Sequence, residues 1–454
     1  MAHLDNMEYP DAKFTKPFRL TILGLFIAAF LIISPGVILY SIGYRYDWQA
    51  GLLRETGAIS IDVEPETTVA YLNNIKLKSS VPIRLNNITP GKYTVRLEAE
   101  NYLSWFKEVE VKNKQTVYIK EINLIQKNEP KLIRTGDIFD PVLSDDGQYL
   151  AYNLFTNDKI EIRILKTEDK SDTLITTFNT NLTPRFTWAK NKNLLTVVTP
   201  GFQKQGEINV FNAENINENW SITPPVGQEI VKHQWKESGE EIYYSLSGKT
   251  LHTFNLTSKT TKDLGIKNYT DWHLDGSQLW LVRPTSTTLQ WEIVRDVYGY
   301  FQKTIEFELT DGNEPTILGV KKDAALVKSG PNQEVTLIYS DHRVSFNAGK
   351  DLISKYNDWW LFWTPSELRT FNYNDEPALL TRSGETLKDV LPLDEYNALL
   401  LVWADKTTIM HPYYLVNTPL LDYTISDPTA DTEKRTLYYT STVNKQKGLW
   451  SLQY

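Results

Sequence analysis

A short motif that recurs through the C-terminal part of the chain constrains the fold most strongly. Each copy is a polar turn followed by a short apolar segment, as in residues 144–152 (SDDGQYLAY). Successive copies follow at intervals of 35–47 residues, with a mean of 41. The equivalent apolar positions are Leu150, Leu195, Ile242, Leu279, Ala325, Trp360, Leu399 and Leu437. A period of this length, built from short β-type runs without helical periodicity, is typical of β-propeller blades.

The repeats predict an all-β propeller of about eight blades over residues 130–454. Seven blades is the alternative, because the copies at Ala325 and Leu437 are the least regular. An α-solenoid of this period would need two helices per repeat, and the apolar runs are too short for that. We expect residues 131–134 to pair with the final segment, residues 449–454, because one shared blade protects both strand edges.

The first copy of the motif is similar to one known propeller family. Residues 144–152 resemble the Ser-Pro-Asp-Gly-x-x-apolar-Ala-Tyr motif of TolB-like propellers, with Asp145 in place of the proline. Two looser versions, KESGEEIYY and HLDGSQLWL, begin at Lys236 and His273. The resemblance supports the fold. It implies little about activity, because TolB-like propellers include binding proteins and accessory domains of peptidases.

One long apolar segment lies near the N-terminus. No charged residue occurs between Arg19 and Arg45, and we expect a transmembrane helix over residues 20–43, with an apolar core that begins at Leu20 and ends at Tyr40. As a helix this core would be about 31 Å long, which matches a hydrocarbon layer of about 30 Å. A signal peptide would have a shorter apolar core and small residues after it, so a membrane anchor is the favoured interpretation.

The charges around this segment predict its orientation. Lys13, Lys16 and Arg19 precede it, so the positive-inside rule places a cytoplasmic tail at residues 1–19 and the rest of the chain outside the cytoplasm. Arg45 follows on the other side and reduces the bias. The chain is therefore expected to be a single-pass protein of the cell membrane.

A small β-sandwich is expected after a juxtamembrane linker, residues 44–56. Residues 57–125 alternate between apolar and polar types in six or seven short runs that are separated by turn residues. Runs of this kind, about five residues each, build two packed sheets rather than helices.

The same segment resembles the PEGA domain of bacterial surface proteins. The positions that carry the resemblance are Gly57, Ile59, Ile61, Pro65, Glu66, Val69, Tyr71, Pro82, Pro90, Gly91, Tyr93, Asn101 and Tyr102. Thr67 and Thr68 replace the family's Gly-Ala, and Asn101 replaces a glycine. Asparagine tolerates positive φ, so the second change is mild. The resemblance implies an extracytoplasmic interaction module without catalytic residues, and a bacterial source.

Composition excludes several classes of function. The formal net charge is −8, from 48 Lys and Arg against 56 Asp and Glu residues, so nucleic acid is not an expected partner. The chain has no cysteine, which excludes disulfides, cysteine-ligated metals and a cysteine nucleophile. The six histidines are scattered without a metal-binding spacing. We therefore expect no metal, no cofactor and no catalytic residue.

Carboxylates leave an enzymatic alternative open. Acidic residues that could meet at the mouth of the propeller channel are Asp145, Asp146, Glu240, Glu241, Asp427, Asp431 and Glu433. A propeller glycosidase or lyase could use a pair of such acids from different blades. The simpler interpretation is that they are turn residues, which the neighbouring glycines and prolines favour.

Exposed aromatic residues are the candidates for binding. Tyr298, Tyr300 and Phe301 flank Gly299 at an expected hairpin tip, and Trp359 lies in the densest aromatic run, residues 358–363. Aromatic side chains on a surface suit both peptides and glycans. The favoured function is a non-catalytic binding or scaffold module of the cell envelope, for a protein or a cell-wall glycan. The alternative is an extracytoplasmic enzyme with carboxylates at the channel mouth.

Overall fold

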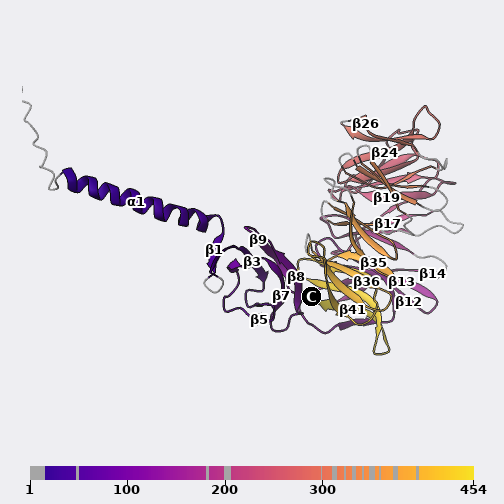
Figure 1. Cartoon of the computed structure of the whole chain (residues 1–454). Coiled ribbons are helices and arrows are strands. Elements are labelled where there is room, and N and C mark those ends of the chain that lie inside the picture. The colour runs from indigo at the N-terminus through magenta and orange to yellow at the C-terminus, as the bar shows by residue number, and fades with distance from the viewer. Residues whose placement is uncertain are drawn as a thin grey trace, which may run out of the picture. The chain divides into compact units, whose positions relative to one another are not determined.

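The chain forms two compact units, residues 1–125 and residues 126–454 (Figure 1). Their structure comes from a computed structural model. It describes residues 16–47, 51–179, 184–198, 206–297, 299–308, 314–321, 324–329, 334–339, 342–346, 353–356, 359–371, 377–394 and 398–454. Each unit has its own core and is described separately below.

The first unit begins with helix α1, Lys16–Ser41, which is apolar and exposed (Figure 1). The most apolar 18-residue window of the span Pro17–Ser41 has a mean hydropathy of 2.7, and the span is long and apolar enough to cross a membrane. The helix starts earlier than the expected residue 20, because Pro17 suits a first helical turn, and it continues through Pro35. It ends just before Gly43, whose positive φ suits a helix terminus.

Two small sheets follow the helix and a short hairpin of strands β1 (Tyr44–Asp47) and β2 (Leu52–Glu55). One sheet has the order β6-β3-β9 and the other β5-β4-β7-β8. Their strands are β3 Gly57–Glu64, β4 Val69–Leu72, β5 Ile75–Lys76, β6 Ile83–Ile88, β7 Gly91–Glu98, β8 Trp105–Val111 and β9 Thr116–Asn123. These seven strands agree with the sequence prediction of a small β-sandwich.

Alternation along the strands builds the core of this sandwich. Ile59, Ile61 and Val63 of β3 are buried, and Val95 and Leu97 of β7 are buried on the other sheet. Apolar residues at every second position point to one face of a strand, so the two sheets bury one face each. Asn101 has a φ of 63°, so the residue that replaces a glycine of the family motif does adopt the left-handed conformation.

The described residues of the second unit form eight antiparallel sheets of four strands each. In order around the unit the sheets are β11 Asp137–Leu143, β12 Tyr149–Thr156, β13 Lys159–Lys166, β14 Asp172–Asn179; β15 Arg185–Trp188, β16 Leu194–Val198, β17 Ile208–Asn212, β18 Asn219–Ile222; β19 Ile230–Trp235, β20 Glu241–Leu246, β21 Leu251–Asn255, β22 Thr260–Asp263; β23 Asp271–Asp275, β24 Gln278–Pro284, β25 Gln290–Val297, β26 Tyr300–Glu308; β27 Thr316–Lys321, β28 Ala324–Ser329, β29 Glu334–Tyr339, β30 His342–Phe346; β31 Ile353–Tyr356, β32 Trp359–Trp363, β33 Glu367–Phe371, β34 Ala378–Arg382; β35 Leu387–Pro392, β36 Leu399–Trp403, β37 Thr407–His411, β38 Val416–Leu421; and β39 Ser426–Asp431, β40 Thr436–Val443, β41 Gln446–Gln453 with β10 Lys131–Thr135.

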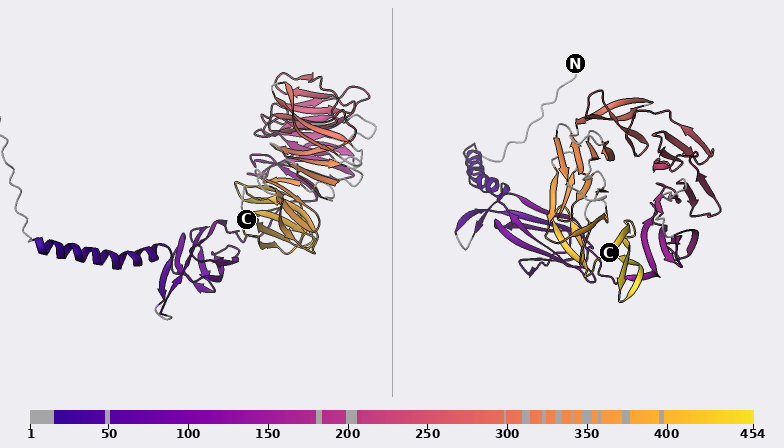
Figure 2. Two further views of the ribbon diagram at one scale, coloured as in Figure 1. Left: turned by 45° about the horizontal axis from the view of Figure 1, so that its top comes forward. Right: turned by 90° about the vertical axis from the view of Figure 1, so that its right-hand side faces the viewer.

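The sheets stand around a common axis (Figure 2). First strands of neighbouring sheets contact one another, as β23 and β27 do, so these strands are innermost. Apolar side chains fill the space between neighbouring sheets. Trp280 and Ile293 of one sheet, for example, share a cluster with Ile317, Ala325 and Val327 of the next. Each sheet therefore buries both faces against its two neighbours, which is the architecture of a β-propeller.

The repeated apolar positions of the sequence all lie in the second strand of their sheets. Leu150, Leu195, Ile242, Leu279, Ala325, Trp360, Leu399 and Leu437 are all buried, on β12, β16, β20, β24, β28, β32, β36 and β40. The motif is thus a first turn followed by the most buried strand of a blade. Its burial explains why the apolar part of the motif recurs in every sheet.

The two ends of the unit meet in one sheet. Strand β10 pairs with β41, Lys131 opposite Ser451 and Leu132 opposite Trp450. The expected pairing of residues 131–134 with residues 449–454 is therefore confirmed. Gly448 lies at this junction, and a β-carbon there would come 2.1 Å from the carbonyl oxygen of Arg134.

Substitution at Gly448 tests the closing strand pair. Gly448→Ala should lower the free energy of unfolding by about 3 kcal/mol, because the new methyl group forces the two strands apart. Gly384→Ala is the matched control, since a β-carbon there has no atom within 4 Å. It should change stability by less than about 0.5 kcal/mol. Chemical denaturation of the full chain in detergent, followed by tryptophan fluorescence, measures both. Equal midpoints for the two variants would contradict the closing role of this pair.

Candidate functional site

The strand order defines two ends of each propeller sheet. At one end of each sheet the first strand begins, and the turn after the second strand lies there too. We call this the entry end. The turns after first and third strands lie at the other, called here the turn end. A pocket of about 550 Å³ lies at the entry end, where the inner strands β19, β23 and β27 begin. A groove of about 970 Å³ lies at the turn end.

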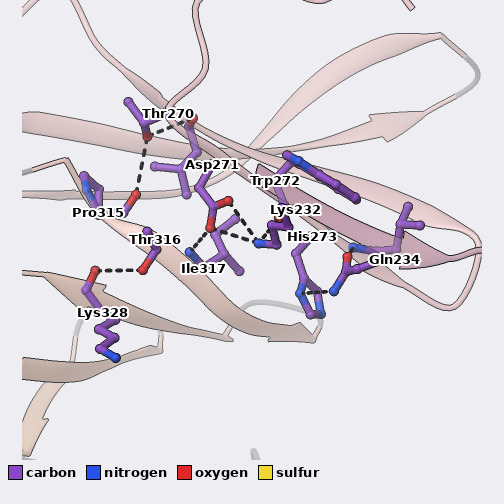
Figure 3. Close-up of polar contacts among 12 residues, drawn as sticks. Lys232, Gln234, Thr270, Asp271, Trp272, His273, Pro315, Thr316, Ile317 and Lys328 are labelled. Carbon is purple, nitrogen blue, oxygen red and sulfur yellow. Dashed lines mark hydrogen bonds and ion pairs between the residues drawn. The ribbon is translucent and has the colours of Figure 1, made fainter. Parts of the chain in front are cut away.

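An ion pair and a backbone hydrogen bond to its carboxylate join three sheets at the entry-end pocket (Figure 3). The ammonium of Lys232 on β19 lies 2.9 Å and 3.1 Å from the two carboxylate oxygens of Asp271 on β23. Lys232 also donates to the carbonyl of Trp272. The carboxylate accepts a third hydrogen bond, 2.7 Å, from the backbone N–H of Ile317 on β27. Asp271 is buried, so these donors supply the partners that a buried charge needs.

A glutamine and a histidine continue this network along β19 and β23 (Figure 3). The side-chain oxygen of Gln234 accepts from the N–H of Leu274 at 2.6 Å. This fixes the amide orientation, so the amide nitrogen faces Nδ1 of His273 at 3.2 Å. Because an amide nitrogen can only donate, Nδ1 accepts, and a neutral His273 carries its proton on Nε2. The network orients side chains rather than pairing a nucleophile with a base.

His233 faces the preceding sheet. Its Nε2 lies 2.9 Å from the hydroxyl of Thr187 on β15. Burial lowers the pKa of His233 from 6.5 to about 4. The imidazole is therefore neutral at physiological pH and acts as a hydrogen-bonding partner between sheets, not as a charge.

The carboxylates highlighted by the sequence lie mostly in turns, and several meet at the turn-end groove. Asp145, Asp146, Glu240 and Glu433 line it together with Glu214 and Glu218. Hydrogen bonds and an ion pair join neighbouring turns in this groove. The N–H of Asn191 donates to Asp145 at 3.2 Å, the amide of Asn193 donates to Asp146 at 3.0 Å, and Lys192 pairs with Glu240 at 3.3 Å. The acids thus connect successive turns.

Asp146 shows the effect of this turn structure on a carboxyl group. Partial burial opposes its charge, but hydrogen bonds from the N–H of Gln148, the hydroxyl of Ser144 and the amide of Asn193 outweigh it. Together they hold the pKa of Asp146 below its ordinary value. A general acid needs a raised pKa instead, so the hydrogen bonds of Asp146 are those of a residue that stabilises the turn.

The remaining highlighted acids are divided between ion pairs and the inner strands. Glu241 pairs with Lys236 at 2.9 Å, and Asp431 with Lys434 at 3.0 Å. Asp427 on β39 accepts from the N–H of Asp140 on β11 at 3.4 Å and from the hydroxyl of Thr440.

Two further inner-strand acids, Asp140 and Asp389, interact electrostatically with the carboxylate of Asp427. Desolvation and then the charge of Asp427 raise the pKa of both groups. Across the part of the chain that the structure describes, no group of three or more acids and histidines has the geometry to hold a metal ion.

The aromatic candidates do not form one surface. Tyr300 is 81% exposed at the turn between β25 and β26, while Tyr298 lies outside the described residues. Phe301 is half-buried against Trp272 and its neighbours, because strand alternation turns it inward, so only part of its side chain is exposed. Trp359 opens β32, and only its backbone is described. Trp360 and Trp363 are both buried, in clusters on opposite faces of β32.

Comparison with known proteins identifies the β-sandwich of the first unit. Residues 56–126 match the family model of the PEGA domain. The resemblance drawn from the sequence motif is confirmed. We refer to this sandwich as the PEGA-like domain. No match was found among curated protein sequences.

Solved structures similar to part of this chain include a WD40 domain and a β-propeller domain. The C-terminal WD40 domain of Sif2 has a TM-score of 0.47 and 14% identity, over 71% of this chain and 97% of that chain. The β-propeller domain of the Trilobed protease from Pyrococcus furiosus has a TM-score of 0.40 and 12% identity, over 64% of this chain and 97% of that chain. The fold assignment rests on the strand pairing described above.

A double-mutant cycle tests the ion pair in the pocket. Lys232→Met should lower the free energy of unfolding by about 3 kcal/mol, because it leaves the buried carboxylate of Asp271 without its cation. Adding Asp271→Asn should restore more than about 1 kcal/mol of that loss. Lys249→Met is the control, because its pair with Glu314 is more than half exposed and should contribute less than about 1 kcal/mol. Strictly additive effects at Lys232 and Asp271 would contradict the coupling.

The pH dependence of stability tests the burial of His233. Between pH 6.5 and about 4 the unfolded chain takes up a proton at this residue that the folded protein does not. The contribution of His233 to stability is therefore lost as the pH falls through this range. His233→Gln should reduce the stability difference between pH 7.5 and pH 4.5, measured by denaturation midpoints. Parallel profiles for the variant and the wild type would show that His233 is not buried in the neutral form.

Proposed function

We propose that this chain is a single-pass membrane protein whose PEGA-like domain and propeller form a non-catalytic binding or scaffold module outside the cytoplasm. Its partner would be a protein or a cell-wall glycan of the bacterial envelope. The helix α1 would anchor the chain, with residues 1–19 in the cytoplasm.

The exposure of α1 supports the anchor. Leu20, Phe26, Ile32 and Tyr40 are each more than 60% exposed, and none of the helix's most apolar 18-residue window is buried within the protein. So large an apolar surface needs an apolar environment, and a hydrocarbon layer of about 30 Å supplies one of the right length. The preceding basic residues support the proposed orientation.

The entry-end pocket carries the binding assignment. The carboxylate of Asp271 is already bound by Lys232 and by the backbone of Ile317, so the charges hold the strands in place rather than act on a substrate. Val231, which lines the pocket, is 69% exposed on β19, and Val226 in the loop before it is 97% exposed. A rigid rim with exposed apolar groups beside hydroxyl and amide groups suits recognition of a peptide or a glycan.

Single cysteines test both parts of this proposal, because the natural chain has none. Val231→Cys in the full chain should react with a membrane-impermeant maleimide in intact cells, whereas Ala2→Cys should react only after lysis. The reverse pattern would contradict the orientation.

The same position then tests binding. With a photoactivated crosslinker on the cysteine, Val231→Cys should form an envelope adduct that excess unmodified protein competes away. Tyr413→Cys is the matched control, because Tyr413 is 77% exposed in the turn between β37 and β38, at the turn end. An adduct of equal yield at both positions, or only at Tyr413, would contradict a binding site at the entry end.

The inner-strand acids favour the alternative of an extracytoplasmic glycosidase or lyase. The raised pKa of Asp140 and of Asp389 is the property that a general acid requires. Steady consumption of an envelope glycan by the wild type, abolished in Asp389→Asn, would replace the binding assignment with this one.

A further inference from the structure

The entry-end pocket contains hydrogen-bonding groups that the fold leaves unused. Tyr269 and Trp272 both line it, and they are only 5% and 1% exposed. Among the described residues, neither the hydroxyl of Tyr269 nor the Nε1–H of Trp272 has a hydrogen-bond partner. A buried donor without an acceptor destabilises a fold. Two such donors in the wall of one pocket therefore indicate that a bound molecule supplies the acceptors.

The charged side chains of the lining leave one positive charge without a counter-charge in the pocket. These side chains are Lys232, Lys249 and Asp271. The carboxylate of Asp271 is bound by Lys232, so these two charges cancel (Figure 3). The charge of Lys249 remains, and a ligand with a negative charge therefore fits this pocket better than a cationic one.

Lys249 can exchange its present partner for a ligand. It lies in the turn between β20 and β21, and its ammonium lies 2.8 Å from a carboxylate oxygen of Glu314, which precedes β27. Both side chains are more than half exposed, and Glu314 does not line the pocket. An ion pair exposed to water contributes little to stability, so a carboxylate in the pocket can replace that of Glu314 at low cost.

The apolar part of the lining favours a peptide over a glycan. The rings of Tyr269 and Trp272 are buried, so neither offers the open face on which a sugar ring stacks. Val231, an aliphatic residue, is 69% exposed, and Leu246 and Leu318 line the same pocket. Aliphatic groups near a cation match the end of a peptide chain, where an apolar side chain and the terminal carboxylate belong to one residue.

We propose that the entry-end pocket binds the carboxyl terminus of an extracytoplasmic protein that ends in an aliphatic residue. The terminal carboxylate pairs with Lys249 in place of Glu314, and the last side chain packs against Val231. Main-chain carbonyls of the peptide accept the hydrogen bonds of Tyr269 and Trp272. This assignment deepens the proposed binding function and rests on it.

Fluorescence anisotropy with synthetic peptides tests the site. The probes are labelled pools of short peptides that each end in one fixed residue, with either a free or an amidated carboxyl terminus. The protein is the full chain in nanodiscs. Pools that end in valine, leucine or isoleucine should bind most tightly. Amidation should weaken their binding at least about tenfold, because it removes the charge that Lys249 recognises.

Substitutions on both sides of the exposed ion pair distinguish recognition from structure. Lys249→Met should weaken binding of the free-acid peptides about tenfold, and Lys249→Arg less than about threefold. Glu314→Gln should strengthen binding about threefold, because it removes the carboxylate that competes with the ligand. Lys190→Met is the matched control and should bind like the wild type. Lys190 is 56% exposed, as Lys249 is, and pairs with Glu237 at the turn end.

Tyr269→Phe tests the unused hydroxyl. It should weaken peptide binding about fivefold without lowering the denaturation midpoint, because the hydroxyl has no partner to lose in the free protein.

Four results would overturn the site: equal affinity for free and amidated peptides, weaker binding in Glu314→Gln, unchanged binding in Tyr269→Phe, or a bound glycan that no peptide displaces. The crosslinking experiment at Val231 then shows how far the failure extends. If Val231→Cys still forms its competed envelope adduct, only the carboxyl-terminal assignment is wrong. If it forms none, the proposed binding function is wrong as well.

Discussion

Pairing of the strand edges β10 and β41 is the constraint on which the second unit depends. Every propeller sheet has two apolar faces and can bury them only between two neighbours. The last sheet takes three strands from the C-terminal end of the chain and its outermost strand from residues 131–135. This pairing joins the ends of the ring and leaves no long apolar edge at its junction. The close approach of Gly448 to Arg134 shows how little space the junction allows.

The packed sheets of the ring hold the polar groups of the inner strands in place. Lys232, Asp271 and the N–H of Ile317 belong to three successive sheets, and the apolar clusters between these sheets hold them at the spacing that the hydrogen bonds require. The buried carboxylate in return makes any shift between the sheets costly, since a displaced Asp271 would lose its partners. The pocket at the entry end is therefore rigid, which suits recognition because few groups need to be ordered on binding.

Most of the architecture could be predicted from the sequence, because it depends on local patterns. The repeated apolar positions identified the second strand of every sheet, and Asn101 was recognised as a replacement for glycine. The network around Asp271 was missed because it joins residues far apart in the chain whose side chains have no motif. A signal did exist: Lys232 precedes Asp271 by 39 residues, and Asp271 precedes Ile317 by 46, each about one repeat. A search for polar residues that lie one repeat apart on first strands would have indicated the ion pair of Lys232 and Asp271.

We propose above all that the propeller binds an envelope partner without altering it. The most direct measurement is to incubate the full chain in nanodiscs with separated protein and glycan fractions of the envelope, and to analyse bound and unbound material by mass spectrometry. We expect a saturable partner that is recovered intact and that protects the starts of β19, β23 and β27 from hydrogen exchange. Continuous conversion of a glycan or peptide, with no protection of these strands, would contradict it.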